Sequence, residues 1–354
     1  MNISIVEQYR ITRDSRKEFL ASLAKDIKRT LREGDFAFVD VPYRVKREAS
    51  LIQKLRDPKW AFKTIDEVHD VCGLRVITYL REDIDRAFSL LNNVFDVTNQ
   101  LERKPDDPTQ FGYLSVHAQI RYRDTHPKKS KDWSGYYAEL QVRTVLQHTW
   151  AEIEHDLGYK NDVGPPEHLK RRFALLSALL EIGDREFDEL RRDVSKYVAD
   201  VAEQPADALA RRRVDVHTLA QFVSTSPVLA HIMSAVRSAV GAARLTEHDF
   251  LPAASALDYL NVVLISDVAS ALEKEQQHLP PFISYFLTSA NFAEVADGAA
   301  IDFLALYIAA SRSYDDLYGM LRSIAPSGSD DSDSAKSHSV YEYFVKARNQ
   351  SGTV

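Results

Sequence analysis

The first 160 residues mix two hydrophobic periods, one typical of helices and one typical of strands. Apolar side chains three or four positions apart predict an amphipathic helix over residues 14–32, and its stripe consists of Phe19, Leu20, Leu23, Ile27 and Leu31. Similar spacing predicts helices at residues 48–56, 84–94 and 144–157, whereas strands are predicted at residues 73–80, 97–103, 114–123 and 136–143. This order indicates an α/β (α+β) layer fold, with a mixed sheet of about five strands flanked by helices.

From residue 167 onward the pattern becomes wholly helical. A long helix is predicted at residues 169–197, followed by several short helices separated by Pro227, Pro252 and Pro280. Residues 325–338 are rich in Ser and Asp, which is typical of a linker, and a short helix is predicted at residues 340–347. We therefore expect a first domain (1–197), an all-helical accessory domain (198–324), and a linker with a terminal helix (325–354). The accessory domain carries no recognisable motif, so regulation, oligomerisation and partner binding all stay open as its role.

Composition narrows the class of protein. The chain has 354 residues and a single cysteine, Cys72, which excludes a disulfide framework and a cysteine-based zinc site. The apolar stretches at residues 257–265 and 299–310 are too short to cross a bilayer, and the N-terminal segment is polar, so we expect a cytoplasmic protein without a membrane partner. The net charge of −7 argues mildly against bulk nucleic-acid binding, although basic clusters occur at residues 128–131 and 170–172.

A first polar group surrounds the start of the predicted helix at residues 48–56. Arg44 and Lys46 come just before that helix, and Ser50 and Lys54 are four positions apart on one of its faces. Three cations and a hydroxyl near a helix N-terminus favour an anion site. A charged amphipathic helix would show the same pattern.

Further polar groups lie on the predicted strands. Asp70 precedes a strand that contains Arg75, and a bulge or turn at Gly73 would bring the two to one side. In the strand at residues 136–143, Glu139 and Gln141 alternate with apolar residues and so share a face. Tyr113 and His117, four positions apart on another strand, would line a floor beside the carboxylate.

Together these residues resemble the synthetase domain of the RelA/SpoT family, which makes guanosine penta- and tetraphosphate. Five elements follow the family's order: R-x-K-x(3)-S-x(3)-K from Arg44, D-x(2)-G-x-R from Asp70, G-Y-x(3)-H from Gly112, E-x-Q-x-R-T from Glu139, and W-A-E-I-E-H-D-L-G-Y-K from Trp150. The resemblance covers roughly residues 10–195 and is strongest to small single-domain synthetases. It implies a nucleotidyltransferase-like fold, and within the last motif we expect Trp150 and Leu157 to be core residues.

The resemblance implies a complete site for the donor, ATP. Arg44 and Arg75 would stack on its adenine, and its phosphates would be held by Lys46, Ser50 and Lys54. Asp70 and Glu139 would bind Mg²⁺. Glu139 would also take the proton of a ribose 3′-hydroxyl, which attacks the β-phosphorus of ATP while AMP leaves.

The acceptor side is implied less completely. Tyr113 would stack on the guanine of GDP or GTP, Gln141 would lie beside it, and His117 would contact acceptor phosphate or order the floor. Glu154 would orient a strand residue or the guanine. His148 stands where small synthetases often carry Asn or Asp near the guanine, so the identity of the acceptor is the least determined part of the site.

Three functions remain open on these residues. The leading hypothesis is a GTP/GDP pyrophosphokinase that uses ATP and Mg²⁺ to make the alarmone (p)ppGpp. The second is a toxin-type relative that pyrophosphorylates the 3′-end of tRNA, and the third is a non-catalytic nucleotide sensor. A homo-oligomer, and tRNA or a regulatory protein as a partner, also stay open.

Overall fold

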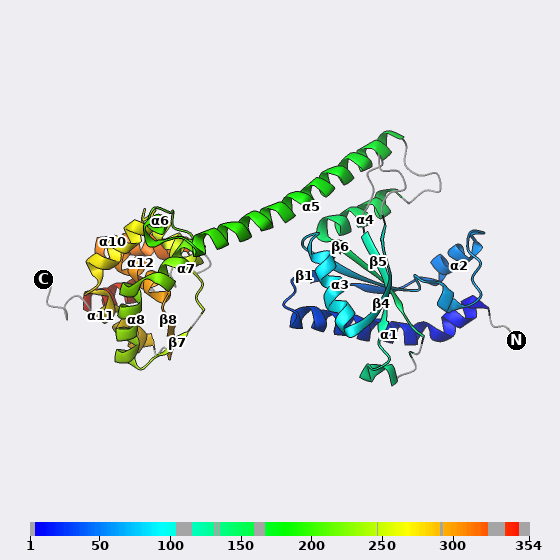
Figure 1. Ribbon diagram of the computed structural model, residues 1–354, viewed down its shortest axis with the longest axis horizontal. Coiled ribbons are helices and arrows are strands. Elements are labelled where there is room, and N and C mark those ends of the chain that lie inside the picture. The colour runs from blue at the N-terminus through cyan, green and yellow to red at the C-terminus, as the bar shows by residue number, and fades with distance from the viewer. Residues whose placement is uncertain are drawn as a thin grey trace. The chain divides into compact units, whose positions relative to one another are not determined.

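The computed structural model describes residues 4–103, 115–130, 133, 135–158, 167–245, 247–290, 293–324 and 337–346 (Figure 1). The chain forms two compact units that divide between Asp193 and Val194. The sequence pattern placed the corresponding boundary between residues 197 and 198, inside the same long helix.

The first unit alternates helices and strands along the chain. Its elements are α1 (Ile5–Glu33), β1 (Phe38–Asp40), β2 (Tyr43–Val45), α2 (Glu48–Arg56), β3 (Cys72–Thr78), α3 (Asp83–Val94), β4 (Phe95–Arg103), β5 (Ser115–Tyr122), β6 (Ala138–Thr144), α4 (Val145–Gly158) and most of α5 (Glu167–Ala202). Short 3₁₀ turns lie at Ile65–Glu67 and Pro127–Ser130.

The strands of this unit form one mixed sheet. Its order is β1-β3-β6-β5-β4, and β2 also pairs with β3. Strands β3 and β6 run parallel, whereas β4 with β5, β5 with β6, and β1 and β2 with β3 are antiparallel. The predicted mixed sheet is thus confirmed. Strands β1 and β2 were not predicted, because three residues are too few to show a period of two.

The hydrophobic core of the unit lies between the sheet and helices α1 and α3 (Figure 1). Ala138, Leu140 and Val142 of β6 are fully buried in this core, so Glu139 and Gln141 between them face the other side of the sheet. The core also contains the predicted stripe of α1. That helix begins at Ile5 rather than at residue 14, because Ser4 caps it and Tyr9 is fully buried.

Helix α4 buries only part of its surface. Trp150 is buried, and the centroid of its ring lies 5.5 Å from that of the Phe173 ring, as expected of a core residue. Leu157, however, is 66% exposed, so the expectation that it is a core residue is wrong. It lies in the last turn of α4, and the described residues leave that turn open to solvent.

Helix α5 is anchored by polar contacts to the end of strand β6 and to the start of helix α3. Thr144 at the end of β6 donates a hydrogen bond to Oδ2 of Asp184 (2.8 Å), and Arg191 donates two bonds of 2.7 Å to Oδ1 of Asp83. Asp184 is 3% exposed, and its Oδ1 has no hydrogen-bond partner among the described residues. Burial raises the pKa of the Asp184 carboxyl to about 6, and the bond from Thr144 only partly offsets this.

The described residues of the second unit are helical apart from one pair of short parallel strands. Its elements are α6 (Ala206–Ala210), α7 (Val216–Thr225), α8 (Pro227–Val240), β7 (Ala243–Leu245), α9 (Leu251–Tyr259), α10 (Ile265–Glu275), α11 (Leu279–Ala290), β8 (Glu294–Ala296), α12 (Ala299–Arg312) and α13 (Tyr314–Ile324). Residues 337–346 form a further helix, and its Val340 and Phe344 are buried in the core of this unit.

Among the described residues, no single helix is both long and apolar enough to cross a membrane. Helices α7 and α8 reach the required length and apolar character only together, and they are bent by 76° at their junction.

Replacing Asp184 with Asn should stabilise the first unit at about pH 7.5 but hardly at about pH 4.5. Because its folded-state pKa is raised, the folded protein keeps this proton up to about pH 6, whereas the unfolded chain loses it near pH 4. The free energy of unfolding therefore falls as the pH rises through this window, by about 1.4 kcal/mol per unit of pKa difference. The asparagine amide does not ionise, so the variant keeps the stability that the wild type loses. Denaturant unfolding of the wild type and the variant at both pH values measures the two free energies of unfolding.

The matched control is Asp193→Asn, which changes an exposed carboxyl on the same helix. It should leave the pH dependence as it is in the wild type. A stabilisation by Asp184→Asn that is equal at the two pH values would contradict the buried, proton-binding carboxyl.

Candidate functional site

A cavity of about 410 Å³ opens on the polar side of the sheet, opposite the core. Strands β2, β3, β5 and β6, helix α2 and the segment between α2 and β3 all contribute side chains to it. Of the residues singled out from the sequence, seven line the cavity: Arg44, Lys54, Asp70, Arg75, His117, Glu139 and Gln141.

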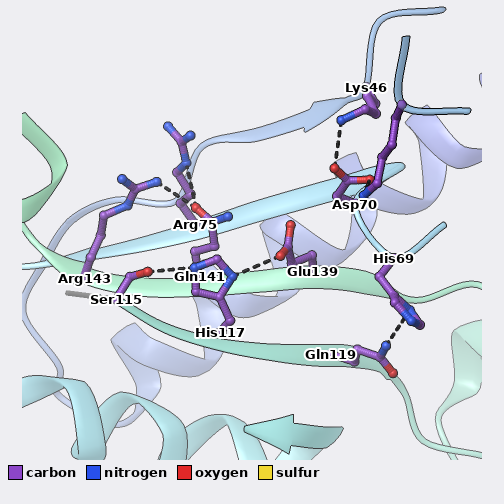
Figure 2. A network of polar contacts seen from close by, with 11 residues as sticks. Lys46, His69, Asp70, Arg75, Ser115, His117, Gln119, Glu139, Gln141 and Arg143 are labelled. Atoms are coloured by element: carbon purple, nitrogen blue, oxygen red, sulfur yellow. Dashed lines mark hydrogen bonds and ion pairs between the residues drawn. The ribbon is translucent and has the colours of Figure 1, made fainter. Parts of the chain in front are cut away.

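Strand register brings these residues together from distant parts of the chain. In the parallel pair of β3 and β6, Gly73 lies opposite Glu139 and Arg75 opposite Gln141. On the other side of β6, the antiparallel strand β5 places His117 opposite Gln141. Because alternate residues of a strand share a face, Arg75, His117, Glu139 and Gln141 point to the same side (Figure 2).

Asp70 lies between two lysines at one end of the cavity. Its Oδ2 accepts a hydrogen bond from Lys46 (2.7 Å; Figure 2). Its Oδ1 accepts one from Lys54 (2.9 Å). Burial would raise the pKa of the Asp70 carboxyl, but the two ammonium groups outweigh burial and lower it. Asp70 sits in the turn before β3, and this turn rather than a bulge brings it to the same cavity as Arg75.

Two aromatic rings, not anticipated from the sequence, stand beside the lysines. Trp60 and Phe62 stack with their centroids 5.5 Å apart and their planes 8° apart, and Nζ of Lys54 lies 4.9 Å from the centroid of the Trp60 ring. Both rings line the cavity, and Trp60 is 47% exposed. They lie in an irregular segment where no hydrophobic period marks them, so the sequence pattern gave no signal.

Arg75 and the amide of Gln141 form the other end of the cavity. Oε1 of Gln141 accepts hydrogen bonds from Nη2 of Arg143 (2.7 Å) and Nε of Arg75 (3.3 Å) (Figure 2). Arg75 also donates to Glu152 of α4. Burial would raise the pKa of the Glu152 carboxyl, but the bond from Arg75 outweighs it and lowers that pKa. Sequence reasoning missed Glu152, because its link to Arg75 depends on how α4 packs against β3 and β6.

Glu139 is held by a histidine of the neighbouring strand. Nδ1 of His117 lies 2.9 Å from Oε1 of Glu139, and Nε2 of His117 lies 2.7 Å from Oγ of Ser115. The side chains of His117 and Glu139 are only 13% and 17% exposed. Ser115, like Trp60, Phe62 and Glu152, was not selected from the sequence.

The remaining predicted residues are less central. Ser50 is exposed on α2, one turn before Lys54. His148 and Glu154 lie on α4 and are not among the cavity-lining residues; burial raises the pKa of the Glu154 carboxyl. Nδ1 of His148 is 3.9 Å from Oε1 of Glu152. Tyr113 falls outside the described residues.

The chemistry of the cavity suits a polyanion together with a hard metal ion. Lysines and arginines are the usual partners of phosphate oxygens, and the carboxylates of Asp70 and Glu139 are hard oxygen ligands. The described residues contain no cluster of three or more His, Cys, Asp or Glu side chains that could enclose a metal by themselves. Mg²⁺ fits this donor set, because it is commonly bound by one or two carboxylates plus substrate phosphates.

Comparisons with known proteins point to one family. The model of the region found in RelA / SpoT proteins matches residues 43–164. The chain is 30% identical over 159 residues to GTP pyrophosphokinase YjbM of Bacillus subtilis (strain 168), an alignment that covers 44% of this chain and 73% of the relative. It is 27% identical over 141 residues to GTP pyrophosphokinase YwaC of the same organism, covering 36% and 60%. The crystal structure of small alarmone synthetase 1 from Bacillus subtilis aligns at 28% identity with a TM-score of 0.45, covering 53% of this chain and 97% of that chain.

Replacing Asp70 with Asn should tighten the binding of inorganic pyrophosphate in metal-free buffer, by about three- to tenfold. The substitution removes the negative charge to which Lys46 and Lys54 are bound, so both ammonium groups become available to the anion. Titration calorimetry in the presence of a chelator measures the change.

Asp40→Asn is the control, since Asp40 pairs with Lys28 and does not line the cavity. Its affinity for pyrophosphate should equal that of the wild type. Unchanged or weaker binding by Asp70→Asn would show that the two lysines do not form an anion site.

Proposed function

The chain belongs to the RelA/SpoT family, and from this premise we propose that it transfers pyrophosphate from ATP to the 3′-hydroxyl of GDP or GTP. The products would be AMP and the alarmone (p)ppGpp. One observation supports the proposal above the others. Three of the residues expected to bind the donor, Arg44, Lys54 and Arg75, come from three separate segments of the chain, and they line one cavity that also holds both carboxylates.

On the donor side, we propose that Arg44 and Arg75 stack on the adenine. Both guanidinium groups line the cavity, and Arg75 is oriented by its bonds to Gln141 and Glu152, so its plane is fixed before ATP binds. Lys46 and Lys54 would exchange Asp70 for phosphate oxygens, and Ser50 would add a hydroxyl near the N-terminus of α2.

We propose Mg²⁺ as the cofactor, held by Asp70 and Glu139. These carboxylates line one cavity, and release of Lys46 and Lys54 to the phosphates would free the Asp70 oxygens. When bound, the ion would neutralise part of the charge on the donor phosphates.

In the proposed reaction Glu139 takes the proton of the acceptor's 3′-hydroxyl. The hydroxyl oxygen forms a bond to the β-phosphorus of ATP, and the bond between that phosphorus and the oxygen bridging to the α-phosphate breaks. AMP leaves with that oxygen. The cations at both ends of the cavity would hold the reactants in line, and positioning of this kind supplies much of the rate enhancement in phosphoryl transfer.

On the acceptor side, Gln141 and His117 are the cavity residues that we propose to lie nearest the nucleotide. The roles of Tyr113, His148 and Glu154 in binding guanine remain predictions from the sequence. One contact bears on RNA as an alternative acceptor. Lys128 of the basic cluster at residues 128–131 bonds to the buried carboxylate of Asp26 (2.7 Å), so this lysine has a structural partner.

The acceptor can be identified with ATP labelled at the β- or γ-phosphate. The purified chain is incubated with Mg²⁺ and either GDP, GTP or bulk tRNA. We expect label to move into guanosine nucleotides, to stay out of tRNA, and to stop moving when a chelator removes Mg²⁺. Label moving only into tRNA would replace the proposed acceptor, and nucleotide binding without transfer would indicate a sensor.

Glu139→Gln should reduce transfer by about 10²- to 10⁴-fold, because the amide cannot accept the hydroxyl proton. Its melting temperature should stay close to that of the wild type, since the substitution keeps the size of a side chain that faces the cavity. Turnover near the wild-type rate would rule out Glu139 as the base.

A further inference from the structure

A line of three side chains runs along the cavity floor from Ser115 through His117 to Glu139 (Figure 2). Ser115 is 2% exposed, and its backbone lies at the start of β5, paired with Arg103 of β4. Ser115 and His117 are two positions apart and share a face of β5. Glu139 lies on β6, diagonally opposite His117, because the direct neighbour of Glu139 on β5 is Gln119, whereas His117 is opposite Gln141.

The partners of His117 determine which of its ring nitrogens carries a proton. An ionised carboxylate only accepts hydrogen bonds, so the 2.9 Å contact with Oε1 of Glu139 requires a proton on Nδ1. In a neutral imidazole Nε2 is then an acceptor, and the hydroxyl of Ser115, 2.7 Å away, must donate to it. The contact with Glu139 therefore sets the tautomer, and the hydroxyl of Ser115, which can donate or accept, is compatible with it.

We propose that Ser115 and His117 are positioning residues for Glu139. Ser115 holds the imidazole ring at its Nε2, and the bond from Nδ1 of His117 fixes the orientation of the Glu139 carboxylate toward the hydroxyl that it deprotonates. The inference rests on the proposed function for its kinetic consequence only. It gives His117 a role through Glu139, distinct from the acceptor contact expected from the sequence.

Two substitutions of His117 separate its contact with Glu139 from its contact with Ser115. In His117→Asn the amide nitrogen can occupy the place of Nδ1 and still donate to Glu139, whereas in His117→Gln it reaches the place of Nε2 instead. We expect kcat to fall about 10- to 100-fold in His117→Gln and clearly less in His117→Asn, with the KM for ATP within about twofold of wild type in both.

Ser115→Ala should lower kcat by a smaller factor, about three- to tenfold, and also leave the KM for ATP unchanged. Equal losses in the Asn and Gln variants, or a loss that appears in KM rather than in kcat, would overturn the positioning role. His231→Asn, an exposed histidine of α8, is the control and should not change either constant.

A second measurement does not depend on catalysis. Long-range ¹H–¹⁵N correlations of the imidazole rings in the full-length protein report the tautomer of each of the 11 histidines, and the resonance lost in His117→Asn assigns His117. We expect a proton on Nδ1 in the wild type and in Ser115→Ala alike, because the carboxylate of Glu139 sets the tautomer. A proton on Nε2, or on both nitrogens, in the wild type would refute the arrangement.

The two measurements also separate this inference from the proposed function. A wild-type protein that shows the Nδ1–H tautomer but transfers no pyrophosphate would leave the hydrogen-bonded line intact and remove the proposed reaction. A wild-type protein that transfers pyrophosphate while His117 carries its proton on Nε2 would support the proposed reaction and refute the hydrogen-bonded line.

Discussion

The site depends on the parallel pairing of β3 with β6. Its register sets Gly73 beside Glu139 and Arg75 beside Gln141, and so joins two motifs that are more than sixty positions apart in the sequence. The pairing is held by burial of the opposite face, where Ala138, Leu140 and Val142 are inaccessible to solvent. Because side chains alternate along a strand, a slip of one residue would turn Glu139 into the core, so the hydrophobic face of β6 also fixes the polar one.

Charge is the second constraint, since the cavity collects acids and bases that would be costly to bury alone. Asp70 is compensated by Lys46 and Lys54, and Arg75 of the cavity is compensated by Glu152 of α4, which does not line the cavity. In the proposed reaction the two lysines exchange Asp70 for a substrate group of the same sign, whereas Arg75 keeps Glu152. A polyphosphate would replace Asp70 at the lysines, and the acid would then be free to bind a cation. The ion pairs thus keep the side chains ordered before substrates arrive.

One partner of Glu139 is the imidazole of His117, whose Nδ1 lies 2.9 Å from Oε1 of the carboxylate. A hydrogen bond from the imidazole can orient the carboxylate toward the hydroxyl whose proton it accepts in the proposed reaction. The same strand that supplies His117 supplies Ser115, so the orientation of Glu139 depends on the regular geometry of β5 rather than on a loop.

The second unit encloses a core of its own, including Val340 and Phe344 of the terminal helix.

The sequence by itself determined the mixed sheet, the main helices and the residue types of the donor site, because hydrophobic period and motif spacing are local properties of the chain. It also indicated that Glu139 and Gln141 share a face. Four features were decided only by the tertiary structure. They are the short strands β1 and β2, the rings of Trp60 and Phe62, the pairing of Arg75 with Glu152, and the solvent exposure of Leu157. These features depend on strand register and helix packing between segments distant in sequence, and no local pattern encodes such contacts.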